Sequence, residues 1–319
     1  MTLPTYAQLQ ARTDAPPASS WGLFGERGTA DLAGPEQVLA AAASIRRGAV
    51  FNLDYPLDAF DPPVASQRSV PQHTIVSRHP DHRDDRLDNF WPQAASQLDS
   101  LRHFRHGEHG FYNGTPDSAI AVGSPALGIN RWAEKPITGR GILLDVSAHR
   151  GKTGHPIDHP AGEHLTVSDL DATLREQRIE PRVGDILLLH TGWAHWYLHE
   201  TDQATHDEVR LAKRTTGLEQ STDTLEWLWD NHFSLAASDT YALEAMPPSE
   251  NSPTAGNRDA GMLHPNILGL LGLPIGELWL LHDLAADCAA DDAYDCMVVV
   301  KPLHLVGGVG SPANATAIK

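Results

Sequence analysis

Short apolar runs with strand character alternate along this chain with segments of helical spacing, and this alternation limits the fold more than any other feature. The runs are bounded by Gly, Asp or Pro, and they cover residues 49–55, 141–146, 185–190, 233–238, 277–281 and 296–300. Helical patterns occupy residues 34–48, 168–177, 222–231 and 263–272. Because apolar strands that alternate with helices form a sheet covered on both faces, the sequence predicts an α/β protein.

The predicted helices carry start and stop signals. Pro35 stands in the first turn of the first helix, and Gly48 follows its apolar stripe. In the second helix we expect Ser168 as the N-cap, with Asp171 at the capping-box position. Gly272 is expected to end the last helix.

Two segments without such periodicity, 54–96 and 147–164, are rich in Pro, Asp, Arg and His, and the sequence predicts long irregular loops there. Loops of this length tend to be functional or to wrap a neighbouring subunit. No repeat or low-complexity linker divides the chain, so we expect a single domain over residues 1–319. Within it, residues 1–50 are expected to form an N-terminal extension and helix that packs on the core or on a neighbouring subunit.

Charge and composition exclude several classes of protein. The formal net charge is −17 and Lys and Arg form no cluster, so nucleic acid is not an expected partner. No apolar run approaches the roughly 20 residues that span a bilayer, and the first residues lack a secretory pattern, so we expect no membrane partner and a cytoplasmic location. The cysteines, Cys288 and Cys296, are too few for a disulfide framework and are expected to be reduced and buried.

The stretch SQLDSLRHF carries Asp99 four residues before His103. In a helix this spacing gives an exposed ion pair worth about 0.2–0.5 kcal/mol. The alternative is a carboxylate and an imidazole that face one substrate, and the turn-rich aromatic stretch GEHGFYNG that follows favours a pocket wall. The spacing alone leaves both interpretations open.

Six stretches spread over nearly the whole chain read PTYAQLQARTDAPPASSWGLFG, SQLDSLRHF, GFYNG, GDILLLHTGW, LHPNILGLLGLPIGELWLL and GGVGSPANA. Together they resemble the putative cyclase family, which includes bacterial kynurenine formamidases and isatin hydrolases. The resemblance implies a metal-dependent hydrolase of amide, lactam or lactone bonds with a swivelling β/β/α fold. It also implies an oligomer, for which we expect a homodimer or homotetramer.

The family's motif is His-x-Gly-Thr-His-x-Asp-x-Pro-x-His, in which two histidines and the aspartate hold the metal and the last histidine is the acid/base. The resemblance places the aspartate on Asp99, the last histidine on His103 and the metal histidines on Gln93 and Gln97, so it implies a Zn or Mn site there. An amide oxygen is a poorer ligand than imidazole, which predicts weak metal binding and a branch of the family with Gln-x-Asp at this place. No nucleotide cofactor is expected, because GGVGSP lacks the strand and helix of a dinucleotide fingerprint.

The family's second pair of site residues falls on His264 and Glu277. If these residues meet Asp99 and His103, two carboxylates and two imidazoles share one cleft and shift each other's pKa values. The simpler alternatives are that His264 caps the start of its helix and that Glu277 lies at a strand edge. The expected substrate walls, for most of which core packing is an equal alternative, are Gln97, Phe104, Phe111, Tyr112 and Trp132.

Other histidines are expected to lie outside the site. One group could bind a metal, but its Pro and Gly content indicates a flexible loop with structural or incidental roles. It comprises His149, His155, Asp158, His159 and His164. His195 and His199 lack the intervening glutamate of a zinc-protease helix, so we expect them on a solvated face.

No Gly-x-Ser-x-Gly elbow occurs and neither cysteine has an activating neighbour, so water is the expected nucleophile. The sequence therefore favours a hydrolase that opens an amide, lactam or lactone bond of a small cyclic or aromatic metabolite, with His103 as acid/base. Asp99 would orient His103 or hold a metal, and His264 and Glu277 would complete the polar wall. Two alternatives stay open: a cyclase or dehydratase acting on a biosynthetic, polyketide-like intermediate, and a metabolite-binding protein on the same fold.

Overall fold

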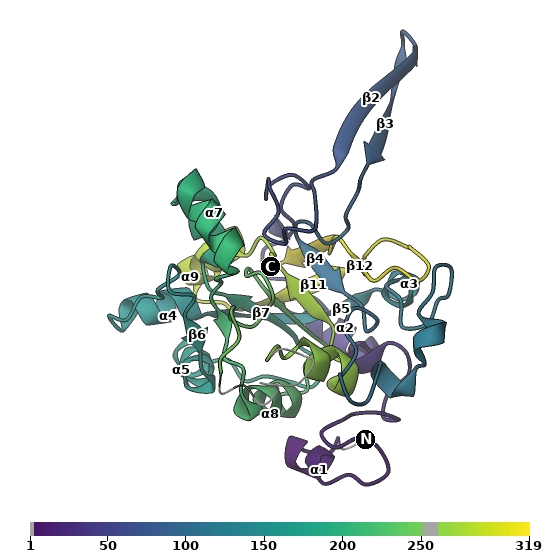
Figure 1. Cartoon of the computed structure of the whole chain (residues 1–319). Coiled ribbons are helices and arrows are strands. Elements are labelled where there is room, and N and C mark those ends of the chain that lie inside the picture. The colour runs from purple at the N-terminus through teal and green to yellow at the C-terminus, as the bar shows by residue number, and fades with distance from the viewer. Residues whose placement is uncertain (1–2, 251, 253–260) are drawn as a thin grey trace.

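The centre of the protein, seen in a computed structural model that describes residues 3–250, 252 and 261–319, is a mixed sheet. Within these residues nine strands pair in the order β1-β13-β11-β5-β7-β9-β10-β4-β12 (Figure 1). Their bounds are Val50–Asn52 (β1), Gln97–Asp99 (β4), Ile137–Asp145 (β5), Ile186–His190 (β7), Leu235–Ser238 (β9), Ile275–Glu277 (β10), Asp295–Val300 (β11), Gly310–Ser311 (β12) and Ala315–Ile318 (β13). The predicted α/β fold is confirmed.

The sheet is parallel in its centre and antiparallel at both sides. β5, β7, β9 and β10 run parallel to one another. On one side β11, β13 and β1 pair antiparallel, and on the other β4 and β12 do so. Every residue of β7 and β9 is buried, because apolar runs such as ILLLH are covered on both faces.

Helices flank this sheet and connect its strands. The α-helices are Tyr6–Gln10 (α1), Pro35–Ala42 (α2), Asn130–Glu134 (α3), Val146–Lys152 (α4), Val167–Gln177 (α5), Trp193–His199 (α6), Gln203–Ala212 (α7), Thr222–Asp230 (α8) and His282–Asp291 (α9). A π-helical segment spans Pro265–Leu271 and ends at Gly272 in the left-handed region, as its sequence predicted. Short 3₁₀ helices span Gly28–Leu32, Tyr112–Gly114 and Asp117–Ala119.

The predicted helix starts need one correction. α5 takes Thr166 as its N-cap, with Asp169 as the capping-box partner, so the prediction of Ser168 and Asp171 is wrong. Thr166 is the N-cap because its hydroxyl accepts from the backbone N–H of Asp169, while the Asp169 carboxylate accepts from the backbone N–H of Thr166.

Two predicted elements end earlier than expected. α2 begins at Pro35 as predicted but stops at Ala42, well before Gly48. The strand predicted over residues 277–281 ends at Glu277, because Leu278 has a φ of 55° that breaks the extended backbone.

The two predicted irregular loops contain regular structure, so that expectation is wrong. Residues 54–96 hold a hairpin of β2 (Gln72–His79) and β3 (His82–Asp88), which projects from the body (Figure 1). Residues 147–164 include most of α4 and the start of a small sheet of β6 (His164–Leu165) and β8 (Gly217–Leu218). The hairpin is exposed on both faces, so it lacks the apolar alternation that reveals a half-buried strand.

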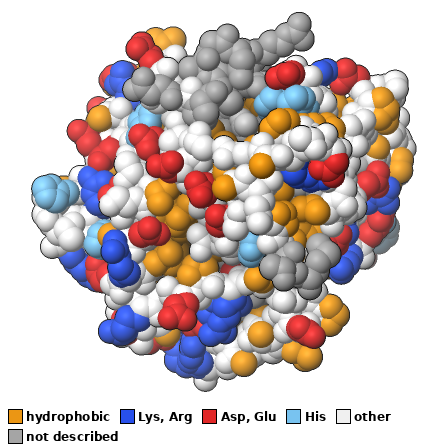
Figure 2. Space-filling model, turned by 90° about the horizontal axis from the view of Figure 1, so that it is seen from below, with side chains coloured by type: hydrophobic (Ala, Val, Ile, Leu, Met, Phe, Trp, Pro, Cys, Tyr) orange, Lys and Arg blue, Asp and Glu red, His pale blue; other side chains and the backbone are white. Residues whose placement is uncertain are grey.

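The first residues of the described chain pack on the core. Tyr6 and Leu9 are buried, and the Tyr6 backbone N–H donates to Asp230 Oδ1 at 2.7 Å. Cys288 in α9 and Cys296 in β11 are buried and free, as predicted. Among the helices that the structure describes, none has the length and apolar character needed to cross a membrane. On the face drawn in Figure 2, Lys and Arg side chains lie among Asp and Glu side chains.

Candidate active site

Two neighbouring strands carry the predicted acids. β4 and β10 pair antiparallel, with Gln97 opposite Glu277 and Asp99 two residues further along β4. Residues two apart on a strand share a face, so these three side chains lie on the same side of the sheet. Gln97 Nε2 donates to Glu277 Oε2 at 2.6 Å, and all three residues are buried. The strand register therefore joins acids from two remote parts of the chain.

His264 lies beside these acids, immediately before the π-helical segment. Its Nδ1 is 2.8 Å from Glu244 Oε1, and its Nε2 is 2.9 Å from Glu277 Oε1. Glu244 is fully buried, and its Oε1 also accepts from the backbone N–H groups of Leu263 and His264. Glu244 could not be predicted from the sequence, because no motif spacing links it to His264. His264 occupies the N-cap position of that segment, as one alternative held, but its side chain makes no cap bond and contacts the two glutamates instead.

The charges in this cluster follow from burial and pairing. Although burial opposes protonation, Glu244 and Glu277 raise the pKa of His264 well above its ordinary value. Burial raises the pKa of Asp99, and His103 opposes that rise. His264 is therefore an imidazolium at neutral pH, held between two carboxylates.

His103 completes the group of four predicted residues. Its Nε2 lies 3.9 Å from Asp99 Oδ2, which is beyond hydrogen-bond distance, and its ring packs against Phe104. Asp99 is in a strand and has no exposed side-chain surface, so the interpretation as an exposed helical ion pair is wrong. Burial lowers the pKa of His103, although Asp99 acts against this, so the imidazole is neutral at neutral pH.

A cavity of about 200 Å³ opens onto this cluster. Of the predicted substrate walls, Gln97 and Phe104 line it, together with the site residues His103, His264 and Glu277. The remaining lining residues are Gln67, Arg68, Lys213, Tyr241, Ala242, Met246 and Met262.

The other three predicted walls are placed elsewhere. Tyr112 is fully buried and bonds to Ser20, while Trp132 is 1% exposed and donates from Nε1 to the Arg27 carbonyl. Phe111 packs against the main core. None of the three lines the cavity beside His103, so the core-packing alternative is the one that the described residues support.

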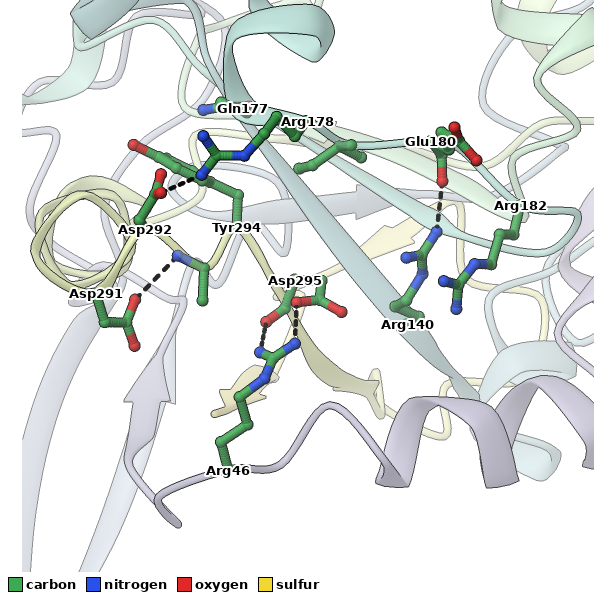
Figure 3. Close-up of a pocket in the computed structure, with 12 residues that line it drawn as sticks. Arg46, Arg140, Gln177, Arg178, Glu180, Arg182, Asp291, Asp292, Tyr294 and Asp295 are labelled. Carbon is green, nitrogen blue, oxygen red and sulfur yellow. Dashed lines mark hydrogen bonds and ion pairs between the residues drawn. The ribbon is translucent and has the colours of Figure 1, made fainter.

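A larger cavity, of about 560 Å³, lies away from these residues (Figure 3). Three of its four arginines are engaged: Arg46 pairs with Asp295, Arg178 pairs with Asp292, and Arg140 donates to the Glu180 carbonyl. The figure shows these pairs across the pocket walls. Because these charged groups bond to one another, the larger cavity offers no convergent acid/base group, and the smaller cavity is the better candidate site.

Comparison with known proteins assigns the family. The sequence profile described as Putative cyclase matches residues 51–245, which is more than half of the chain. The chain belongs to the putative cyclase family. No curated protein sequence matches it.

Solved structures agree with this assignment. A crystal structure described as a novel cyclase is 31% identical, with a TM-score of 0.81 over 94% of this chain and 99% of that one. Isatin hydrolase A from Ralstonia solanacearum is 17% identical, with a TM-score of 0.58 over 90% of this chain and 98% of that one. An isatin hydrolase bound to the product analogue thioisatinate is 14% identical, with a TM-score of 0.56 over 89% and 98%. The resemblance read from the sequence is therefore confirmed for family and fold.

The metal that the putative cyclase family implies finds a matching donor set here. Ligand atoms of Asp99, His264 and Glu277 lie within 4.8 Å of one another. Asp99 Oδ2 is buried and has no hydrogen-bond partner among the described residues, and it is 3.9 Å from His264 Nε2. Two carboxylates and one imidazole suit Zn or Mn, so these three residues fit a divalent cation.

The two glutamines at the family's metal-histidine positions are oriented differently. Gln97 Oε1 accepts from Arg68 at 2.9 Å, which directs its Nε2 toward Glu277. The Nε2 of Gln93 donates to Asp99 Oδ1. In this arrangement both amides present nitrogen to the carboxylates, and the assignment of Gln93 and Gln97 as metal ligands stays a prediction.

The remaining histidines have other surroundings. His149 pairs with Glu176, and His159 lies 3.0 Å from Thr216 Oγ1. His195 stacks on His282 with ring centroids 3.8 Å apart. In the described part of the chain none of them belongs to a group of three converging ligand atoms. The His195 side chain is 33% exposed, so the solvated face expected for it is met only in part.

Proposed function

We propose that the protein is a hydrolase that opens an amide, lactam or lactone bond of a small cyclic or aromatic metabolite. The observation that carries this proposal is His103 on the wall of a small cavity that His264 and Glu277 also line. With the buried Asp99, whose Oδ2 is 3.9 Å from His103 Nε2, these two residues form an acid/base floor. A neutral imidazole beside buried carboxylates is the arrangement that general acid–base catalysis needs.

His103 supplies proton transfer in this proposal. It takes a proton from water as the water oxygen bonds to the substrate carbonyl carbon. The bond from that carbon to the ring nitrogen or oxygen then breaks, and His103 returns the proton to the leaving atom. This leaves a carboxylic acid, ionised at neutral pH, and an amine or alcohol, which stay in one molecule when the bond is part of a ring. Asp99, 3.9 Å away, stabilises the imidazolium that forms between the two transfers.

Other groups position the carbonyl. Burial raises the pKa of Tyr241 to about 12, so its phenol stays protonated and can donate a hydrogen bond to the carbonyl oxygen. The His264 imidazolium holds Glu277 at 2.9 Å and balances part of the negative charge of the floor. A divalent cation held by Asp99, His264 and Glu277 would polarise the carbonyl and make a bound water more acidic.

The test is turnover by the His103→Ala variant on a panel of lactams, lactones and aryl amides. We expect kcat to fall by about 10²–10⁴-fold, with the melting temperature unchanged. His304→Ala is the matched control, because the His304 side chain is 57% exposed and does not line the cavity. Full activity of the His103→Ala variant on a hydrolysed substrate would contradict the proposal.

Ring closure is the second candidate, and the description of the matching family and of its 31% identical member as cyclases favours it. The same proton transfers would then expel water. The mass of the product decides between the two, since hydrolysis adds one water and closure by dehydration removes one. Tight binding of panel members without turnover would instead indicate a metabolite-binding protein.

A further inference from the structure

Two cationic side chains line the cavity of this strongly acidic chain. Arg68 comes from the segment before the β2–β3 hairpin, and Lys213 is the residue that ends α7. With a net charge of −17, the protein as a whole repels anions. Two cations that line one small cavity therefore offer positive charge to a ligand within an otherwise acidic protein.

Neither cation is neutralised by a protein acid in the part of the chain that the structure describes. Most other Arg and Lys side chains form ion pairs, as Arg46 does with Asp295 and Arg140 with Asp185. Arg68 and Lys213 form none with described residues. The acid that lines the cavity, Glu277, is already bonded to Gln97 and His264. The cations are thus available to a ligand.

One nitrogen of the Arg68 guanidinium is bonded to protein groups, and its other two nitrogens are available to a ligand. Its NH1 donates to Gln97 Oε1 at 2.9 Å and to the Gln93 carbonyl. Its Nε and NH2 make no hydrogen bond to the described residues. A guanidinium binds a carboxylate through two parallel N–H groups, and these two nitrogens present such a pair. Because Gln97 also contacts Glu277, the guanidinium lies one amide group away from the acid/base floor.

Lys213 lines the same cavity as Arg68, and the helix that it follows is tied to the segment before the hairpin. Arg210, one turn earlier in α7, donates from Nε to the Pro63 carbonyl at 3.0 Å, which ties the end of this helix to the segment that carries Arg68. Other parts of the cavity wall are apolar, with Phe104, Ala242 and Met246.

We propose that this cavity selects a ring-containing substrate that carries a carboxylate, which Arg68 and Lys213 bind while the scissile carbonyl faces His103. This inference rests on the proposed function and names its substrate class. A volume of about 200 Å³ holds one ring with a short substituent, since it equals the space of about seven liquid waters. The guanidinium would bind the carboxylate of such a molecule, and the acid/base floor, one amide group away, would face its scissile carbonyl.

The test compares substrates that differ only in the charge of one group. The pairs are para-acetamidobenzoate with para-acetamidobenzamide, and pyroglutamate with pyroglutamamide, each assayed for kcat/KM. We expect the carboxylate member to be preferred at least about tenfold, as one charge-assisted bond predicts. Arg68→Gln should remove most of this preference and Lys213→Gln a smaller part, while Arg68→Lys should keep some of it. The matched control is Arg182→Gln, which changes an arginine of the larger cavity and should leave the preference intact.

Binding separates failure of this inference from failure of the proposed function. Calorimetry with benzoate and benzamide reports carboxylate recognition without turnover. Binding of benzoate that weakens at least tenfold in Arg68→Gln supports the inference even where no amide is hydrolysed. Equal kcat/KM for both members of each pair, an equal loss for both members in Arg68→Gln, or equal or undetectable binding of benzoate and benzamide overturns it.

Discussion

Two buried histidines of this protein sit among carboxylates, yet their surroundings differ. His264 lies between Glu244 and Glu277 on the wall of the cavity. His190, at the end of β7, lies 2.8 Å from Asp145 and 4.0 Å from Asp239, and it lines none of the cavities described above. The same residue types thus build a candidate reaction centre in one place and a structural pair in another.

The partners of His190 show what the second group does. Asp145 accepts from the backbone N–H of Ala148 and caps α4. Asp239 accepts from the backbone N–H groups of Thr191 and Gly192, at the start of α6. These carboxylates hold two helices at the carboxyl ends of parallel strands. A buried His–Asp pair is therefore not by itself a sign of catalysis, and access to a cavity makes the difference.

The largest effect that separates the two groups is expected from Glu244→Ala. The change leaves the His264 imidazolium with one partner fewer in a fully buried place, so we expect the free energy of unfolding to fall by about 3–5 kcal/mol. Guanidinium denaturation measures it. Glu244→Gln, which keeps an acceptor oxygen, should cost less, and a loss below about 1 kcal/mol in Glu244→Ala would show that the imidazolium is not held there.

A matched pair of aspartate substitutions should change the free energy of unfolding differently. Asp145→Asn replaces the charged partner of His190 and should lower the free energy of unfolding by about 1.5–3 kcal/mol. Asp99→Asn removes a carboxylate whose pKa burial raises, so it should leave stability equal or raise it by about 1 kcal/mol while activity is lost. Thermal melting and turnover of both variants test this, and an equal loss of stability in both would contradict the comparison.

The pH dependence of the His190 pair follows from two opposite pKa shifts. Burial opposes protonation of His190, but Asp145 and Asp239 raise its pKa above 6.5, so this stability is complete below 6.5 and is lost as pH rises through the raised value. Burial opposes ionisation of Asp145, but His190 lowers its pKa below 3.8, so that stability is complete above 3.8 and is lost as pH falls through the lowered value.

The coupling energy between Asp145 and His190 should therefore be greatest between these two pH values and should shrink in alkaline solution. A double-mutant cycle with Asp145→Asn and His190→Asn, measured by denaturation in both conditions, gives this energy. Coupling that stays constant as pH rises well above neutrality would show that His190 is not charged in the folded protein.

The smallest effect is expected from added Zn or Mn. A cation must displace the proton of His264 and compete with the amide bonds of Gln93 and Gln97, so binding should be weak. At a concentration equal to Kd the gain in stability is about 0.4 kcal/mol. Melting curves should show this gain in the unmodified protein and in Asp145→Asn but not in Asp99→Asn, and a gain retained by Asp99→Asn would place the cation elsewhere.

The sequence predicted much of this fold because its central strands are buried on both faces. Runs such as GILLDV and DILLLH gave β5 and β7, and Pro35, Gly272 and the apolar stripe of α8 marked helices. It missed the β2–β3 hairpin, since strands that face solvent on both sides carry no apolar alternation. It also chose the wrong N-cap for α5, because two hydroxyl residues near that helix start compete for one role.

Some residues of the candidate site could be predicted from the sequence, and others could not. Asp99, His103, His264 and Glu277 were predicted from short patterns that resemble those of a family. Glu244, Arg68, Tyr241 and Lys213 were not, because no spacing in the sequence connects them with that pattern. Phe111, Tyr112 and Trp132 were expected at the cavity, yet an aromatic residue in the sequence gives no sign of which side of the core it will fill.

By itself the sequence determined the class of fold, because local hydrophobic pattern sets it, and its resemblance to a known family pointed to four side chains able to move protons. Only the tertiary structure decided which groups meet. The pairing of β4 with β10 places Glu277 beside Gln97. Glu244 contacts His264 through its carboxylate, and Arg68, from the segment before the hairpin, donates to Gln97. Burial and distance set the charge of each group, and both arise from contacts between remote parts of the chain.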